Sequence, residues 1–166
     1  EEDSYNTVRG DFNGRYLLYG GLNKTHIYDV KNDKEINSFN SEDNYIREMY
    51  YSSDSKYVFI GTKPTNFDIN VEEVTTIHVI ETETGNEVNS VQLNIGYISG
   101  MLTKDNNVYM VLNSIIGNSQ KMVVVSYNYV DGYTNWIRDF DGAWGKYITR
   151  SFPEGTNNIA VANYTT

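Results

Sequence analysis

Short apolar runs separated by polar turns dominate the chain. The runs, among them YLLYG, YVFIG, VYMVL and MVVVSY, are rich in β-branched and aromatic residues and have the length of strands. Clusters of Asn, Asp, Gly and Ser, such as DFNG, SSDSK and ETGN, stand between them. No window of a dozen residues repeats apolar positions at the i, i+3, i+4, i+7 spacing of a helix. The pattern therefore predicts an all-β fold.

One fourteen-residue segment of the sequence recurs in a similar form. HIYDVKNDKEINSF, at 26–39, aligns without a gap with HVIETETGNEVNSV, at 78–91. His, Glu, Asn and Ser recur in place, and four further positions exchange similar residues: Ile/Val twice, Asp/Glu and Phe/Val. Self-similarity at a fixed period of this size indicates a repeated supersecondary unit.

The repeat extends beyond this segment. A tyrosine opens a first strand in each repeat, and a second strand begins eleven or twelve residues later. The first strands open at Tyr5, Tyr45, Tyr97 and Tyr147, the second at Tyr16, Tyr57, Val108 and Ile159; third strands lie around Ile27, Val79 and Val124, and fourth strands run through Ile36, Val88 and Ile137. Four sequential strands in 40 to 52 residues are the unit of a β-propeller blade.

We therefore predict one segment, 1–166, of β-propeller blades, each with four antiparallel strands. It holds about three and a half blades: 5–40, 45–94, 97–141 and an incomplete repeat at 147–166. Consecutive apolar residues in YVFI and VVV fit inner strands that are covered on both faces. A β-sandwich is the alternative, since short strands at this spacing suit it too. The gapless repeat favours the propeller.

Two stretches of the second repeat resemble a known family pattern. Residues 53–61 and 76–88 are similar to the blades of WD40-like or YVTN-type propellers, with Glu81 in the acidic position before the turn and Gly85 in the turn. Asp29 fills the acidic position in the first repeat, and Tyr127 stands there in the third. The resemblance implies the fold only, because such propellers serve as scaffolds, ligand binders, sensors and enzyme domains.

Charge and composition exclude several kinds of partner. The chain carries 22 acidic and 13 basic residues, a net charge of −9. So acidic a surface repels phosphate backbones, and we expect no nucleic-acid partner. No apolar run approaches the roughly 20 residues of a membrane-spanning helix, so we expect no membrane insertion. The chain has no cysteine, which rules out disulfides, thiolate metal sites and a cysteine nucleophile.

The residues that could carry chemistry have structural explanations. His26 and His78 are the two histidines, and they occupy equivalent positions in different repeats, so they are not expected to share a metal. Asp29 and Glu81 recur at one position before a turn, where an acid accepts hydrogen bonds from the turn. We therefore predict no catalytic residue, no metal site and no cofactor.

The tyrosines that open the first strands are the best candidates for binding. In a propeller this position lies near the central opening on one face. We predict that Tyr45, Tyr97 and Tyr147, with Trp144 and Arg47 beside them, contribute to a binding face. Packing between blades is the alternative role for these rings.

These observations favour a non-enzymatic binding or scaffold module that uses one propeller face to bind a protein or a glycan. The alternatives are the propeller part of a larger enzyme, of hydrolase or quinoprotein type, and the sensor domain of a receptor. The remaining blades are expected from the rest of the protein, from another chain or from a second copy. An extracytoplasmic or cell-surface location is favoured over the cytoplasm.

Overall fold

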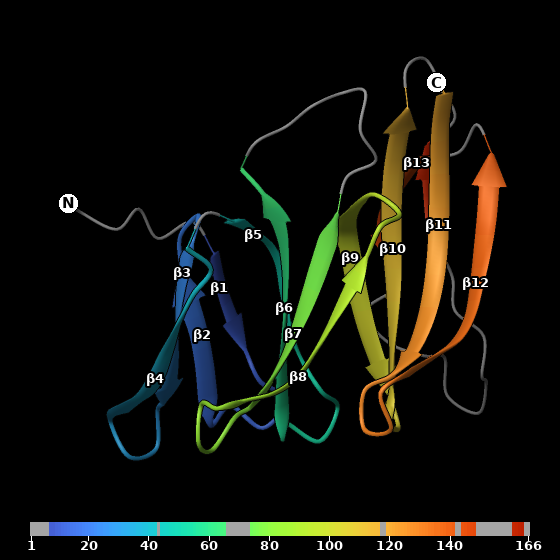
Figure 1. Cartoon of the computed structure of the whole chain (residues 1–166). Coiled ribbons are helices and arrows are strands. Elements are labelled where there is room, and N and C mark those ends of the chain that lie inside the picture. Colours follow the sequence, from blue (N-terminus) through green and yellow to red (C-terminus); the bar gives the residue numbers. More distant parts are fainter. Residues whose placement is uncertain are drawn as a thin grey trace. The chain divides into compact units, whose positions relative to one another are not determined.

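The computed structural model describes residues 7–42, 44–65, 74–116, 119–141, 144–148 and 161–164. Over these residues the chain forms strands β1 to β14, joined by turns, and no helix (Figure 1). Consequently this part of the chain holds no helix that could cross a membrane. The predicted all-β class is confirmed.

Three four-stranded antiparallel sheets follow one another along the chain. The first contains β1 (Thr7–Gly10), β2 (Tyr16–Gly20), β3 (Lys24–Asp29) and β4 (Lys34–Asn40); the second β5 (Asn44–Tyr51), β6 (Tyr57–Pro64), β7 (Thr75–Glu81) and β8 (Glu87–Leu93); the third β9 (Tyr97–Lys104), β10 (Asn107–Ile116), β11 (Ser119–Asn128) and β12 (Tyr133–Asp141). In each sheet the strands pair in sequence order, so the predicted blade topology is confirmed. A hairpin of β13 (Trp144–Ile148) and β14 (Val161–Tyr164) ends the described part.

The sequence repeat reappears as a repeated register. The first residue of β2, Tyr16, lies opposite Asp29, and the first residue of β6, Tyr57, lies opposite Glu81. A side-chain contact between the third and fourth strands also recurs: His26 Nδ1 is 3.1 Å from Glu35 in the first sheet, and His78 Nδ1 is 2.9 Å from Glu87 in the second. The gapless alignment thus reports equivalent places in two blades.

The chain divides into two compact units, which are described separately. Residues 1–65 and 76–91 form the first unit, with the first sheet and most of the second. Residues 66–75 and 92–166 form the second unit, with the third sheet and the β13–β14 hairpin.

The first unit has an apolar core to which both of its sheets contribute. The fully buried members include Leu18 and Ile27 from the first sheet and Val58, Ile60 and Ile80 from the second. Burial of these side chains removes apolar surface from water, which is the main favourable term in folding. A four-stranded sheet alone would leave one of its faces exposed, so each sheet depends on the other.

Polar and aromatic contacts also join the two sheets of the first unit. The Asn37 side chain on β4 donates a hydrogen bond to the carbonyl of Gly85, in the β7–β8 turn, at 2.8 Å. Next to it, the rings of Phe39 and His78 lie 4.7 Å apart, centroid to centroid. The outer strand of the first sheet therefore touches the third strand and the following turn of the second.

In the second unit, burial follows strand order. Met110, Val111 and Leu112 on the inner strand β10 are all buried, although alternate residues of a strand point to opposite faces. On the outer strand β12, by contrast, every residue but Trp136 is exposed. The hairpin strand β13 packs against β9 and β10. Consecutive apolar residues on inner strands were predicted for a sheet covered on both faces, and this sheet shows them.

Substitution of Gly85 by alanine tests the contact between the two sheets of the first unit. The φ of Gly85 is +69°, and an added Cβ would overlap the Cβ of Asn37. Gly14 has nearly the same φ, +68°, but nothing lies within 4 Å of its added Cβ. We expect Gly14→Ala to lower the free energy of unfolding by about 1 kcal/mol, the cost of a left-handed alanine. Gly85→Ala should cost about 1–3 kcal/mol more, because overpacking is added.

Urea unfolding of the two variants and the parent chain measures this difference. Equal losses for Gly14→Ala and Gly85→Ala would contradict the close approach of Asn37 to the β7–β8 turn.

Candidate functional site

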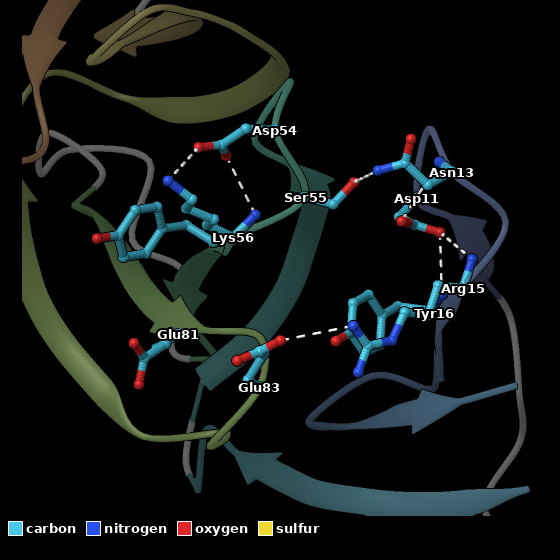
Figure 2. A pocket seen from close by; sticks show the side chains of 10 residues that line it. Asp11, Asn13, Arg15, Tyr16, Asp54, Ser55, Lys56, Glu81 and Glu83 are labelled. Atoms are coloured by element: carbon cyan, nitrogen blue, oxygen red, sulfur yellow. Dashed lines mark hydrogen bonds and ion pairs between the residues drawn. The ribbon is translucent and has the colours of Figure 1, made fainter. Parts of the chain in front are cut away.

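A polar groove opens in the first unit where three turns come together. Its volume is about 370 Å³, and it lies among the β1–β2, β5–β6 and β7–β8 turns (Figure 2). The lining residues are Asp11, Asn13, Arg15, Tyr16, Asp54, Ser55, Lys56, Tyr57, Glu81 and Glu83. A second hollow of about 290 Å³ shares Arg15, Tyr16 and Glu83 with the first and continues toward Asp29 and Asn32.

Asp11 organises the β1–β2 turn. Its carboxylate accepts hydrogen bonds from the backbone amides of Arg15 at 2.8 Å, Tyr16 at 2.9 Å and Asn13 at 3.3 Å. Burial opposes ionisation of this carboxyl, but these hydrogen bonds, led by that of Tyr16, outweigh it and hold the pKa of Asp11 below its ordinary value. The turn therefore carries a fixed negative charge.

The β5–β6 turn repeats this arrangement with different residues. Ser52 takes the place of Asp11, because its hydroxyl accepts the amide of Tyr57 at 2.9 Å. Asp54 accepts the Ser52 hydroxyl at 2.7 Å and the Lys56 amide at 3.1 Å. Although burial opposes ionisation here too, these bonds keep the pKa of Asp54 low. The side chain of Asn13 reaches across to the Ser55 hydroxyl at 3.4 Å and links the two turns.

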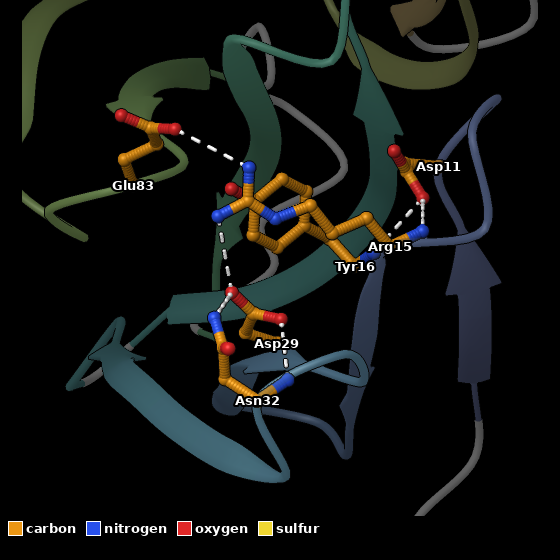
Figure 3. A network of polar contacts seen from close by, with 6 residues as sticks. All are labelled: Asp11, Arg15, Tyr16, Asp29, Asn32 and Glu83. Atoms are coloured by element: carbon orange, nitrogen blue, oxygen red, sulfur yellow. Dashed lines mark hydrogen bonds and ion pairs between the residues drawn. The ribbon is translucent and has the colours of Figure 1, made fainter.

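Arg15 holds the middle of the groove (Figure 3). Its guanidinium lies 3.2 Å from Asp29 and 3.5 Å from Glu83, and its central carbon lies 4.6 Å from the centre of the Tyr16 ring. Desolvation works against the charged form, but the Asp29 hydrogen bond and the surrounding carboxylates raise the pKa of Arg15. A stacked, permanently charged guanidinium is thus fixed over one face of Tyr16.

Two buried polar atoms in the groove lack a hydrogen-bond partner within the described residues, Arg15 Nε and the Tyr16 hydroxyl, and the second is an uncharged group. Tyr16 is only 4% exposed, and its Oη has no hydrogen-bond partner in the part of the chain that the structure describes. Figures 2 and 3 both show the phenol pointing to the side of the groove where Glu83 lies. Burial raises the pKa of Tyr16, so the group stays a neutral phenol. A buried hydroxyl without a partner is costly, and a ligand atom would relieve that cost.

The balance of charge in the groove is negative. Four of the lining residues are acids, Asp11, Asp54, Glu81 and Glu83, and two are bases, Arg15 and Lys56. Within the described residues, no group of three or more His, Cys, Asp or Glu side chains could hold a metal ion. The arrangement suits an organic cation or a hydrogen-bond donor.

The residues with expected structural roles behave as such. Asp29 accepts the amide of Asn32 at 3.1 Å, and Glu81 accepts the hydroxyl of Thr84 at 2.7 Å. In the third sheet Tyr127 lies opposite Val108, in the register position of Asp29 and Glu81. The turn acceptor there, however, is the next residue, Asn128, which accepts the amides of Val130 and Asp131 at 3.0 Å each.

The described tyrosines that were proposed for a binding face are not among the residues that line the groove. Tyr45 and Arg47 are near the start of β5 and do not line the groove; Tyr45 is half-buried and Arg47 is exposed. Tyr97 begins β9 and is half-buried. Tyr5 and the side chains of Trp144 and Tyr147 lie outside the described residues. A binding role for this set therefore stays a prediction.

Sequence reasoning missed Arg15, Tyr16 and Glu83. One signal could have found the first two: GRY at 14–16 and SKY at 55–57 place a cation before a tyrosine at the same point of two repeated turns. The Glu83 contact has no such signal, because it joins residues 68 positions apart.

Comparison with known proteins identifies the fold and no family. No family model matches the chain, and no curated protein does. Solved structures similar to it include the RRP9 WD40 repeats (12% identity, TM-score 0.57, 82% of this chain and 39% of that one) and the Neurospora crassa Pan2 WD40 domain (14%, 0.64, 98% and 48%). Hydrazine synthase from Kuenenia stuttgartiensis is similar as well (13%, 0.68, 87% and 40%).

These likenesses confirm the predicted WD40-like propeller blades. The identities are too low to carry anything beyond the fold. The chain spans between about two fifths and one half of the length of these three structures.

The ionised Asp11 carboxylate makes the free energy of unfolding depend on pH. Asp11→Ala leaves three turn amides without their acceptor and should lower the free energy of unfolding by about 1–3 kcal/mol. Ser53→Ala, at an exposed position of the β5–β6 turn, is the matched control and should change it little.

Because the pKa of folded Asp11 lies below its ordinary 3.8, its contribution is fully present above about pH 4. That contribution is lost as the pH falls through the folded pKa. Unfolding followed from pH 6 to pH 2 should therefore show a gap between parent and Asp11→Ala that narrows in acid. A gap that is constant with pH would contradict the role of the ionised carboxylate.

Proposed function

We propose that this chain is a non-catalytic module that binds a protein partner, and that the turn end of its first unit makes the contact. The observation that supports this most strongly is the buried, unpartnered hydroxyl of Tyr16, which faces a groove built from hydrogen-bonded turns. A group held in place at a free-energy cost, in a rigid polar setting, is what a preorganised binding site requires.

Exposed apolar side chains next to the groove favour a protein as the partner. Phe12, in the β1–β2 turn, is 60% exposed, and its ring meets Tyr50 edge-on at 6.3 Å. Val30, which follows β3, is 45% exposed, and its amide donates to the carbonyl of Arg15 at 2.8 Å. Protein interfaces place apolar and aromatic anchors beside a polar rim in this way.

A glycan has less support at this site. Sugars are commonly held by stacking on an open aromatic face. Arg15 covers one face of the Tyr16 ring, and the residue as a whole is buried. The groove therefore offers a sugar hydrogen bonds but no stacking surface on Tyr16.

Three kinds of protein expected from the sequence are compatible with such a surface. The same surface serves a free scaffold, the propeller part of a larger enzyme or a receptor sensor, because each must dock a partner. A location outside the cytoplasm or at the cell surface belongs to the same proposal, and so does a second contact face around Tyr45, Arg47, Tyr97, Trp144 and Tyr147.

Site-specific photo-crosslinking tests the proposed surface. A benzoylphenylalanine replaces Phe12 in one variant and Val88, which is 53% exposed on β8, in a matched control. After irradiation in the source cells, we expect one discrete protein adduct from position 12 and none from position 88. The adduct should weaken when Glu83→Ala is added, since Glu83 lines the groove. No adduct at position 12, or the same adducts at both positions, would overturn the proposal.

A further inference from the structure

We propose that the groove receives the ammonium group of a lysine side chain from the partner. This inference rests on the proposed function and names the chemistry of its recognition. It follows from which oxygens in the groove are already engaged and which remain open.

The groove acids fall into two classes. Asp11 and Asp54 are committed to their turns, where they accept backbone amides. They contribute negative potential and little bonding capacity. Glu81, the last residue of β7, and Glu83, in the β7–β8 turn, are less engaged. One Glu81 oxygen accepts the Thr84 hydroxyl, and Glu83, whose side chain is 70% exposed, lies 3.5 Å from Arg15. These two carboxylates therefore keep oxygens that a ligand can reach, and the buried Tyr16 hydroxyl, which belongs to the same groove, has no partner of its own.

Three acceptors of this kind match an ammonium group. The lysine ammonium is a compact charge with three donors and no acceptor. The Tyr16 oxygen can accept one hydrogen bond from the ammonium while its O–H donates a hydrogen bond to a carboxylate. Because burial raises the pKa of Tyr16, that proton is present across the physiological range. Binding would satisfy the one buried hydroxyl in the groove that the turns leave without a partner.

A guanidinium fits less well. Arg15 already occupies the middle of the groove and forms ion pairs with one oxygen of Asp29 and one oxygen of Glu83. Arg15 repels any second cation, and a planar guanidinium would have to lie directly against it. An ammonium needs less room and approaches from the Glu81 side. The proposed specificity is therefore lysine over arginine.

Fluorescence anisotropy with labelled hexalysine tests the inference on the whole 166-residue chain, with hexaarginine and fully acetylated hexalysine as comparison probes. Glu81→Gln removes a charge and keeps an acceptor for Thr84. Tyr16→Phe removes the hydroxyl alone. Asp141→Asn, on the exposed outer strand β12, removes a charge that does not line the groove and is the control for general attraction to a chain of net charge −9.

We expect Glu81→Gln and Tyr16→Phe each to weaken hexalysine binding about three- to tenfold, and Asp141→Asn less than twofold. Acetylated hexalysine should not bind, and hexaarginine should bind more weakly than hexalysine. Tyr16→Phe should unfold at the same urea concentration as the parent or a higher one, because it deletes a buried hydroxyl that has no partner.

An equal loss in Asp141→Asn, unchanged binding in Tyr16→Phe, or equal affinity for hexaarginine would each overturn the lysine assignment. None of these results would remove a crosslink from position 12, so the proposed surface and its proposed ligand can fail independently.

Discussion

The face-to-face packing of the first two sheets is the interaction on which the groove depends. Leu18 and Ile27 from one sheet share a core with Val58, Ile60 and Ile80 from the other, all of them fully buried. Full burial of such a side chain is worth roughly 1.5–3 kcal/mol. The groove lies where the turns of these two sheets meet, so its geometry is inherited from the core beneath it. Tyr16 belongs to both, since it is a member of the core cluster and lines the groove.

The turns add a second level of order that the core alone does not supply. In the β1–β2 turn the Asp11 carboxylate accepts the backbone amides. In the β5–β6 turn Ser52 and Asp54 accept them together. Hydrogen bonds to ionised groups are stronger than those between neutral groups, so the Asp11 turn is rigid although it is polar and near the surface. Glu83, on the third turn, is bonded more loosely. The groove therefore combines two carboxylates fixed by their turns with the exposed carboxylate of Glu83, which a ligand can reach.

Much of the fold could be predicted from the sequence, for a physical reason. Strand order within a blade is a local property, because each strand pairs with the next along the chain across a short connection. The repeat of His26–Phe39 at His78–Val91 shows this local order of strands and turns directly in the sequence. The groove is not local. Arg15 meets Glu83 across 68 positions, and no periodicity relates the two. In the third blade the turn acceptor, Asn128, lies one residue beyond the repeat position of Asp29 and Glu81, so the alignment of the repeats did not single it out.

Tyr16 shows why the interesting residue of a site can look unremarkable in a sequence. Its ring does what the pattern predicts, since it opens a strand and joins the core. Its hydroxyl does something the core does not need, because phenylalanine would fill the same space without a buried polar atom. Where stability alone would favour the apolar residue, the polar one requires another explanation. The surrounding acids suggest one: a phenol kept neutral by burial, placed beside negative charge and under a fixed cation, is a hydrogen-bonding group waiting for a donor. Its lost stability is then the cost of keeping a binding site ready before the partner arrives.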